Sequence, residues 1–166
     1  MGKTHRDAGF TLVELMVILI LMGIMFSIGG LNFNNWQRKS HIERQARETI
    51  SDLNAARTDS IFRKQRHSIV INSGATGYVF KRYSSLDENR LAGTVIMTKT
   101  ARYQFAKAAG TSAANRIFEF DLQGFTTDWD SIRINPVDSG AAFDCIVIAA
   151  SRTNIGKMEG GSCVQK

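Results

Sequence analysis

The stretch DAGFTLVELMV, residues 7 to 17, places an acidic side chain at the start of a long apolar segment. Residues 15 to 26, which follow, are apolar apart from Gly23. The ionised carboxylate of Glu14 would cost on the order of several kcal/mol in the hydrocarbon of a membrane unless it is paired, and residues of this kind usually have a function. The sequence therefore raises the question of which group pairs with Glu14.

The apolar segment has the length of a membrane-spanning helix. Residues 10 to 31 would span roughly 33 Å as a helix, close to the ~30 Å of the hydrocarbon layer. Two simple alternatives are a secretory signal peptide, for which residues 27 to 29 (Ser-Ile-Gly) form an acceptable cleavage site, and a signal anchor. Neither alternative needs Glu14, and the carboxylate makes both of them costly.

Cleavage between Gly9 and Phe10 would supply a partner for this carboxylate. It would create an α-amino group at Phe10 with an ordinary pKa of about 8. Glu14 would then lie near the first turn of a helix, where the exposed N–H groups favour an anion. The amine could belong to the same chain or to a neighbouring subunit. In the second case, pairing would select for assembly in one register.

The sequence G-F-T-L-V-E at positions 9 to 14 resembles the type III leader of type IV prepilins and of type II secretion pseudopilins. The resemblance implies that a prepilin peptidase cuts after Gly9 and methylates the new N-terminus at Phe10. It also implies that Glu14 docks the subunit onto other pilin or pseudopilin subunits. The implied location is the bacterial inner membrane, crossed once with the head in the periplasm, and then the filament.

Helical periodicity continues beyond the apolar segment, to about residue 63 or 64. Charged residues, among them Asp52, separate the members of one apolar stripe. The stripe consists of Ile42, Ala46, Ile50, Leu53 and Ile61. Gly29 and Gly30 weaken the helix by roughly 1 kcal/mol each. They bend it, melt it locally or mark the point where it leaves the membrane.

After the helix, the period changes to about two, which predicts strands. The expected strands are 67–71, 77–83, 95–100, 102–105, 117–120, 131–135 and 145–149, with a turn at 72–76. The fold class is therefore α+β: a long N-terminal helix, with a transmembrane half and an amphipathic half, packed on a small antiparallel β-sheet head. The expected parts are a leader (1–9), a transmembrane and filament-core helix (10–31), an amphipathic half (32–65) and a β-rich head (66–166).

The order of elements in the head is similar to that of the GspH/FimT family of minor pilins and minor pseudopilins, over nearly the whole chain. A hairpin follows the helix, IFEFDLQGF occupies positions 117 to 125, and CIVIAASRTNIGK occupies positions 145 to 157. We interpret Phe120, Gly124 and Phe125 as two core aromatic residues around a tight turn.

Cys145 and Cys163 are the only cysteines. A head outside the cytoplasm favours a disulfide between them, which would close a loop of about 18 residues and contribute roughly 3 kcal/mol. The alternative is a pair of unpaired, buried thiols. Two cysteines, with His41 and His67 far away in sequence, make a metal site a poor interpretation.

Catalytic motifs are missing from the sequence. No GxSxG, HExxH, Walker or GxGxxG pattern occurs. Asp128 and Asp130 could form a carboxylate pair, but a solvated loop before a strand explains them better. We therefore expect no enzyme activity, no catalytic residue, no metal, no cofactor and no small-molecule substrate.

The basic residues leave DNA binding open as a hypothesis. The formal net charge is +6, and phosphate contacts need little more than several exposed cations. Positions 38 to 66 contain eight Lys or Arg and four acidic residues. Arg152 and Lys157 lie where some relatives carry a Gly-Arg-x-Arg tip implicated in DNA binding, although only one arginine matches here.

Together the residues and the resemblance predict a minor, low-abundance type IV pilin-like subunit that assembles into, initiates or decorates a pilus. One alternative is a minor pseudopilin of a type II secretion system. A second alternative is a DNA-binding minor pilin for natural transformation.

Overall fold

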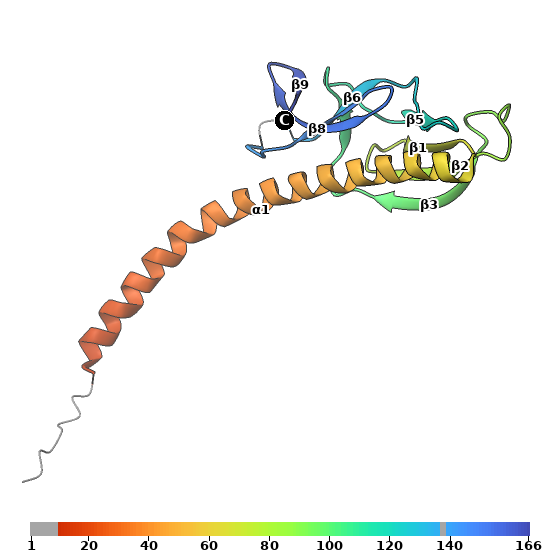
Figure 1. The fold of residues 1–166 in the computed structure, drawn as a ribbon. Coiled ribbons are helices and arrows are strands. Elements are labelled where there is room, and N and C mark those ends of the chain that lie inside the picture. Colours follow the sequence, from red (N-terminus) through yellow and green to blue (C-terminus); the bar gives the residue numbers. More distant parts are fainter. Residues whose placement is uncertain (1–9, 137–138) are drawn as a thin grey trace, which may run out of the picture. The chain divides into compact units, whose positions relative to one another are not determined.

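The computed structural model describes residues 10–136 and 139–166, and of residues 27–32 it describes the backbone only. Figure 1 shows the long helix α1 (Leu12–Arg63) followed by the strands of the head. The chain divides into two compact units between Gln37 and Arg38. The two units are described separately, and the predicted boundaries at residues 31 and 65 stay predictions.

The first unit contains the N-terminal part of α1. Every large apolar side chain from Phe10 to Phe26 is exposed. In the described residues, no helix contains a stretch long and apolar enough to cross a membrane. The predicted span at 10–31 includes side chains that lie outside the description, and it is not confirmed. The helix is continuous through Gly29 and Gly30, so the local melting considered there is not observed.

The second half of α1 packs one face into the head. Its buried apolar side chains are Ile42, Ala46, Leu53 and Ala56. The helix ends at Arg63, as predicted, and Lys64 has a positive φ of 51°, the left-handed conformation that commonly follows a helix. The predicted stripe is wrong at one position: Ile61 is exposed, because the buried face turns toward Ala56 and Ser60 at this end.

Four antiparallel strands form the first sheet, in the order β3-β2-β1-β5. They are β1 (His67–Ile71), β2 (Gly77–Arg82), β3 (Thr94–Thr100) and β5 (Ile117–Phe120). Ile69 lies opposite Phe80 of β2 and opposite Phe118 of β5, and all three side chains are buried. Figure 1 shows β1 and β2 beside the second half of α1. The alternating sequences of these strands direct one face toward that helix.

The turn at 72–76 between β1 and β2 is present as predicted. The Asn72 side-chain carbonyl accepts a hydrogen bond from the Thr76 N–H at 2.9 Å, and Ala75 adopts a positive φ of 53°. Gly77 follows, where a Cβ would lie only 2.3 Å from the Lys99 carbonyl oxygen of β3. The close approach of β3 therefore requires glycine at this position.

Five antiparallel strands form the second sheet, in the order β4-β6-β7-β8-β9. They are β4 (Phe105–Lys107), β6 (Asp130–Ile134), β7 (Cys145–Ile148), β8 (Thr153–Glu159) and β9 (Ser162–Gln165). Alternate residues of β6 and β7 are buried and join the same hydrophobic core as the first sheet: Ile132, Ile134, Ile146 and Ile148.

Two details of the predicted head are wrong. The strand expected at 102–105 lies instead at Phe105–Lys107, because Phe105 pairs with Ile134 of β6 while Tyr103 is held by side-chain contacts from α1. Phe125 is 51 % exposed and is not a core aromatic residue, whereas Phe120 is fully buried. Between them, Gly124 adopts a positive φ of 80°, as the predicted tight turn requires.

Candidate functional site

Glu14 lies in the first turn of α1. Thr11 begins the helix: its hydroxyl oxygen accepts the Glu14 N–H at 3.3 Å, and its carbonyl accepts the Leu15 N–H at 3.2 Å. A hydroxyl in this position satisfies one of the free N–H groups at a helix start. Glu14 thus sits where the helix N-terminus favours a negative charge.

The Glu14 carboxylate has no hydrogen-bond or ion-pair partner among the described residues. Phe10, the neighbouring candidate, is exposed and precedes the helix. Gly9 lies outside the described residues, so the predicted cleavage site is described on one side only. Glu14 is the one charged residue in the sequence from Phe10 to Phe26. The site therefore consists of one carboxylate surrounded by exposed apolar side chains.

The predicted disulfide between Cys145 and Cys163 is present, with Cα atoms 6.0 Å apart. Cys145 belongs to β7 and Cys163 to β9, and both strands pair with β8. The bridge therefore spans β8 at Gly156, where a Cβ would lie 2.8 Å from the Cys163 sulfur and 2.5 Å from the Val164 carbonyl oxygen. The disulfide fixes the C-terminal strand to the middle of the second sheet.

The two residues considered for DNA contact are not brought together. Arg152 is exposed in the turn that connects β7 to β8, whereas Lys157 is half-buried within β8. They are five positions apart along the chain, which is about 16 Å at the usual strand rise of about 3.3 Å per residue. No described feature joins them into a phosphate site, and a DNA contact at these residues stays a prediction.

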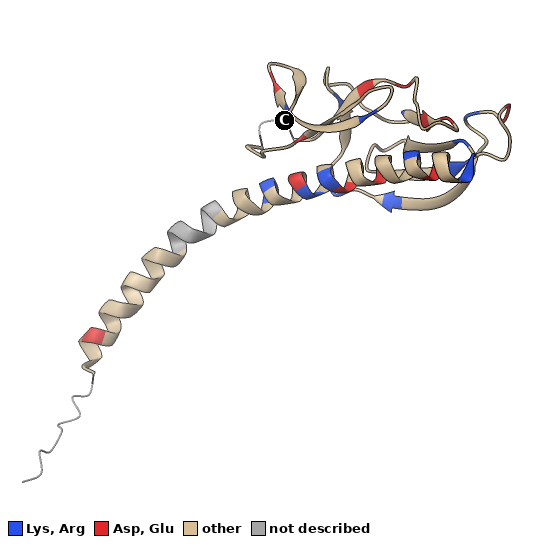
Figure 2. Cartoon of the chain, viewed as in Figure 1, with Lys and Arg blue, Asp and Glu red and all other residues tan. Residues whose placement is uncertain are grey.

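Several basic residues of positions 38 to 66 hold the head together. Arg57 donates hydrogen bonds from α1 to the Gly124 carbonyl at 2.7 Å and to the Ala150 carbonyl at 3.3 Å. Desolvation lowers the pKa of Arg57. Arg66 pairs with Glu119 at 2.7 Å, and both side chains are largely buried. Figure 2 shows acidic positions interspersed with basic ones along this half of the helix. These cations therefore do not form a uniform basic surface.

The prediction that Asp128 and Asp130 lie in a solvated loop is wrong. Asp128 accepts the Glu119 N–H at 3.0 Å and pairs with Arg90. Asp130 pairs with Arg116 at 2.8 Å. Each carboxylate has its own arginine, so the two do not form a catalytic carboxylate pair.

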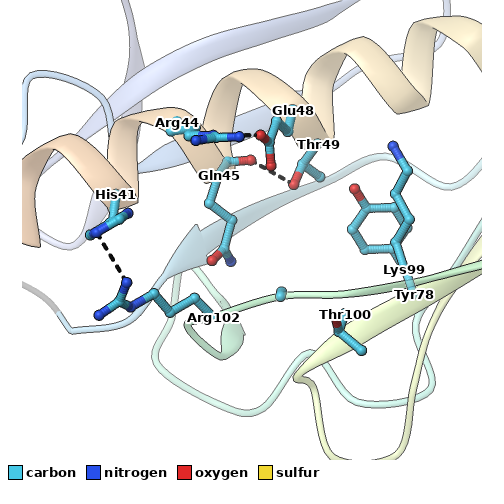
Figure 3. Close-up of a pocket in the computed structure, with 10 residues that line it drawn as sticks. His41, Arg44, Gln45, Glu48, Thr49, Tyr78, Lys99, Thr100 and Arg102 are labelled. Atoms are coloured by element: carbon cyan, nitrogen blue, oxygen red, sulfur yellow. Dashed lines mark hydrogen bonds and ion pairs between the residues drawn. The ribbon is translucent and has the colours of Figure 1, made fainter.

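A polar pocket of about 380 Å³ lies between the second half of α1 and the end of β3 (Figure 3). At one side, Asp52 accepts hydrogen bonds from the Tyr78 hydroxyl at 2.6 Å and from the Lys99 ammonium at 2.6 and 2.8 Å. Burial, followed by the hydrogen bond to Asp52, raises the pKa of the Tyr78 hydroxyl. The helical periodicity predicted that Asp52 lies between the buried positions, and this prediction is wrong. The Asp52 side chain is buried, and the Tyr78 hydroxyl and the Lys99 ammonium supply its hydrogen bonds.

The other side of the pocket is more open. Arg44 pairs with Glu48 at 2.8 Å one turn along the helix. Arg102 lies 3.0 Å from the His41 ring nitrogen, and no carboxylate in the described part of the chain pairs with it. The arrangement offers cations that could bind an anionic group. Sequence reasoning missed the pocket because Lys99 in β3 and Arg102 just after it meet the helix only through contacts between residues 47 and 61 positions apart.

Metal binding finds no support in the described residues. No group of three His, Cys, Asp or Glu side chains there is placed to hold a metal ion.

Residues 4–30 match the family model described as the prokaryotic N-terminal methylation motif. In structure, the chain is similar to the minor pseudopilin EpsH from the Type 2 Secretion System of Vibrio cholerae, with a TM-score of 0.51 and 10% sequence identity. The match covers 71% of this chain and 96% of EpsH. None of the curated proteins matches the chain significantly in sequence. At this identity the likeness establishes the fold, an α+β head behind a long N-terminal helix.

Proposed function

We propose that this chain, a type IV pilin-like protein by its N-terminal motif and its fold, is a minor subunit that assembles into, initiates or decorates a type IV pilus. We propose a structural role for it and assign no catalytic step to any residue. The observation that carries the proposal is the Glu14 carboxylate, which has no partner among the described residues, at the start of an apolar helix with exposed side chains.

The exposed apolar surface supports assembly on energetic grounds. Burying apolar surface contributes about 25 cal/mol per Å², and the side chains from Phe10 to Phe26 are uncovered in the isolated chain. Such a surface marks a site that contacts another protein or a membrane. We propose that equivalent helices of other pilin or pseudopilin subunits cover it in the filament. Before assembly, we propose storage in the bacterial inner membrane with the head in the periplasm, on the strength of the apolar sequence at 10–31.

In the proposed mechanism, a prepilin peptidase cuts after Gly9 and methylates the amine of Phe10. The carboxylate of Glu14 then pairs with the Phe10 amine of a neighbouring subunit. A charge-assisted hydrogen bond of this kind is strong in an apolar environment, where neither group has water as an alternative partner. Subunits in a wrong register would leave both charges buried and unpaired, at a cost of several kcal/mol. The pair would therefore select one register.

A second candidate is a minor pseudopilin of a type II secretion system. The structural likeness to EpsH favours it, since the match spans nearly all of that protein. Both candidates share the same processing and docking steps and differ in the filament that receives the subunit. A DNA-binding minor pilin remains a third hypothesis.

Processing provides the test of this proposal. Mass spectrometry of the membrane fraction from cells with an active prepilin peptidase should find a mature chain that begins at Phe10 and carries an N-terminal methyl group. Gly9→Val should leave the leader attached, since the peptidase of this family accepts a small residue there, whereas Gly2→Val, also in the leader, should be processed normally. A mature N-terminus at Gly30, as a signal peptidase would create, or an intact leader on the unmodified chain would refute the proposal.

A further inference from the structure

Strand β3 is an open edge of the first sheet. It pairs with β2 on one side, and no strand of the described residues pairs with its other side. Six of its seven residues are exposed, including the apolar side chains of Val95, Ile96 and Met97. An edge strand carries a row of unpaired N–H and C=O groups, and a long apolar edge is a template for another strand.

The direction of these backbone groups follows from the register with β2. The Ala101 N–H donates to the Thr76 carbonyl of the β2 side at 2.8 Å, and Lys99 lies opposite Tyr78 while Thr98 lies opposite Val79. Because successive residues of an antiparallel strand point their N–H groups to opposite sides, the backbone N–H of Lys99 points toward β2. The N–H groups of Thr98 and Thr100 point away from the sheet, toward the open edge.

The usual protections of an edge are weak in β3. The strand has no proline, and the ammonium of its one lysine, Lys99, turns toward Asp52. A register shift between Phe80 and Lys81 of β2 interrupts the pairing near Ile96, which leaves the run from Met97 to Thr100 regular. The other edges are shorter: β4 has three residues, and β5 and β9 have four each. From Thr94 to Thr100, β3 is the longest of these edge strands, and its regular run from Met97 to Thr100 equals β5 and β9 in length.

The polar pocket lies beside the end of this edge and supplies a charge preference. Thr100 at the end of β3 and Arg102 just after it line the pocket, and Arg44 lines it from the helix (Figure 3). In an added strand, a residue opposite Lys99 would project to the same face of the sheet as Lys99 itself. That face carries Arg102, which has no carboxylate partner in the described part of the chain. An acidic side chain there would complement it.

We propose that β3 binds an extended, acidic segment of a different protein, which adds to the first sheet as a further strand. The backbone groups of Thr98 and Thr100 hold the added strand, and an acidic side chain of that strand enters the pocket between Arg44 and Arg102. Backbone hydrogen bonds supply affinity in recognition of this kind, and side-chain pockets supply specificity.

A second copy of this chain fits the edge less well. Lys99 contacts Asp52 and Arg102 contacts His41, so β3 runs in the opposite direction to the second half of α1. Antiparallel pairing of two β3 strands would therefore place those helix halves antiparallel. Subunits of one filament have parallel helices, so a second copy in the same filament could not form this contact. This step rests on the proposed function.

A peptide selection tests the proposal without any filament. The full chain, kept in detergent micelles, is used to select from a displayed library of random peptides of about ten residues, a length that covers an ordinary strand. Selected peptides should alternate β-branched or aromatic residues with others and should carry Asp or Glu. Binding of a synthetic selected peptide should slow hydrogen exchange at Thr98 and Thr100 by about tenfold or more, with no change at Ile69 in β1.

Thr98→Pro removes one backbone N–H that points outward and removes no hydrogen bond to β2. An edge strand tolerates proline at a position of this kind. It should weaken binding of the synthetic peptide by about tenfold or more, and the matched variant Thr98→Val should bind within about threefold of the unmodified chain. Arg102→Gln should weaken binding by about three- to tenfold, as for loss of one charge-assisted contact.

Several results would overturn the proposal. They are a selection that enriches no peptide, enriched peptides without acidic residues, and exchange protection away from β3. The exchange measurement on the unmodified chain decides the matter even if Thr98→Pro does not fold. A dimer in sedimentation experiments that Thr98→Pro abolishes would assign the edge to a second copy and refute the heterologous partner. Because these measurements do not depend on leader cleavage, failure here is distinct from failure of the proposed function.

Discussion

The two halves of α1 differ in what stabilises them. From Ile42 to Ser60, every turn places a side chain in the core of the head. Of the charged residues there, Asp52 pairs with Lys99 of β3, Arg44 pairs with Glu48, and Arg57 donates to backbone carbonyls of the head. From Leu12 to Phe26, the side chains are almost all apolar and all are exposed. The second half of the helix therefore buries and pairs its side chains within the described part of the chain. The apolar side chains of the first half can be buried only by a membrane or by another protein.

The difference separates stability from assembly. A change in the second half removes contacts that are present in the folded monomer, so it should lower the free energy of unfolding of the head. A change in the first half removes no such contact and should act on incorporation into a filament. The Glu14 carboxylate is the sharpest case, because it has no partner among the described residues, whereas the carboxylate of Asp52 in the other half has two.

Leucine truncation in the two halves should show the largest contrast. Leu53 is 1% exposed and Leu19 is 64% exposed. Leu53→Ala should destabilise the head by about 2–5 kcal/mol, the cost of a cavity in a packed core. Leu19→Ala should change the free energy of unfolding of the head by less than about 0.5 kcal/mol. Urea unfolding of the full chain in detergent, followed by tryptophan fluorescence and far-UV circular dichroism, measures both; equal effects would contradict the comparison.

Loss of the disulfide should have the next largest effect and should be confined to the head. Cys163→Ser should lower the free energy of unfolding by roughly 3 kcal/mol, as expected for a loop of 18 residues. Thermal unfolding with and without a reducing agent measures this, and the reductant should have no effect on the variant. Leader cleavage should be unaffected, since Gly9 and Phe10 are remote in sequence. Two alkylatable thiols in the exported protein would contradict this account.

The contact between Tyr78 and Asp52 should have a smaller effect. Tyr78→Phe removes a hydrogen bond to a carboxylate that keeps Lys99 as a partner, which should cost about 1.5–3 kcal/mol at neutral pH. Tyr103→Phe is the matched control, because no hydrogen bond to the Tyr103 hydroxyl is found among the described residues. Urea unfolding at pH 7 compares the two, and an equal loss in both variants would contradict the role of Asp52.

The same pair predicts a dependence on alkaline pH. The pKa of Tyr78 is raised in the folded state, by burial first and then by the hydrogen bond to Asp52. The unfolded chain therefore releases the phenol proton near pH 10 while the folded chain keeps it. This contribution to stability is complete below pH 10 and is lost as pH rises above it. Between pH 8 and pH 10.5, unmodified protein should lose more stability than Tyr78→Phe; equal losses would contradict the raised pKa.

Periodicity predicted several elements of the fold. The helix end at Arg63 and the strands at 67–71 and 117–120 agree with the structure. Burial alternates regularly in 117–120, whereas 67–71 is buried nearly throughout, its polar His67 and Ser68 included. The strand β9 was not predicted: three of its four residues are exposed, and pairing with β8 and the disulfide hold it in place. A pattern of apolar residues contains no signal for such a strand.

The candidate site was predicted where it depends on local sequence and missed where it depends on tertiary contacts. Glu14 was found because a carboxylate within an apolar run is unusual. Asp52 was misplaced because a buried carboxylate is identified only by its partners, Tyr78 and Lys99, which lie 26 and 47 residues away. The pocket beside Arg102 was missed for the same reason.

Incorporation of a Glu14→Gln variant tests the central claim most directly. The filament-associated fraction released by shearing is compared with the membrane pool, and head stability is measured in parallel. The account predicts that the variant is cleaved after Gly9 and that the stability of its head is unchanged. Its filament-associated fraction should fall by about tenfold or more, since the charge-assisted pair that selects the register is lost. Normal incorporation of Glu14→Gln, with the mature chain beginning at Phe10, would contradict it.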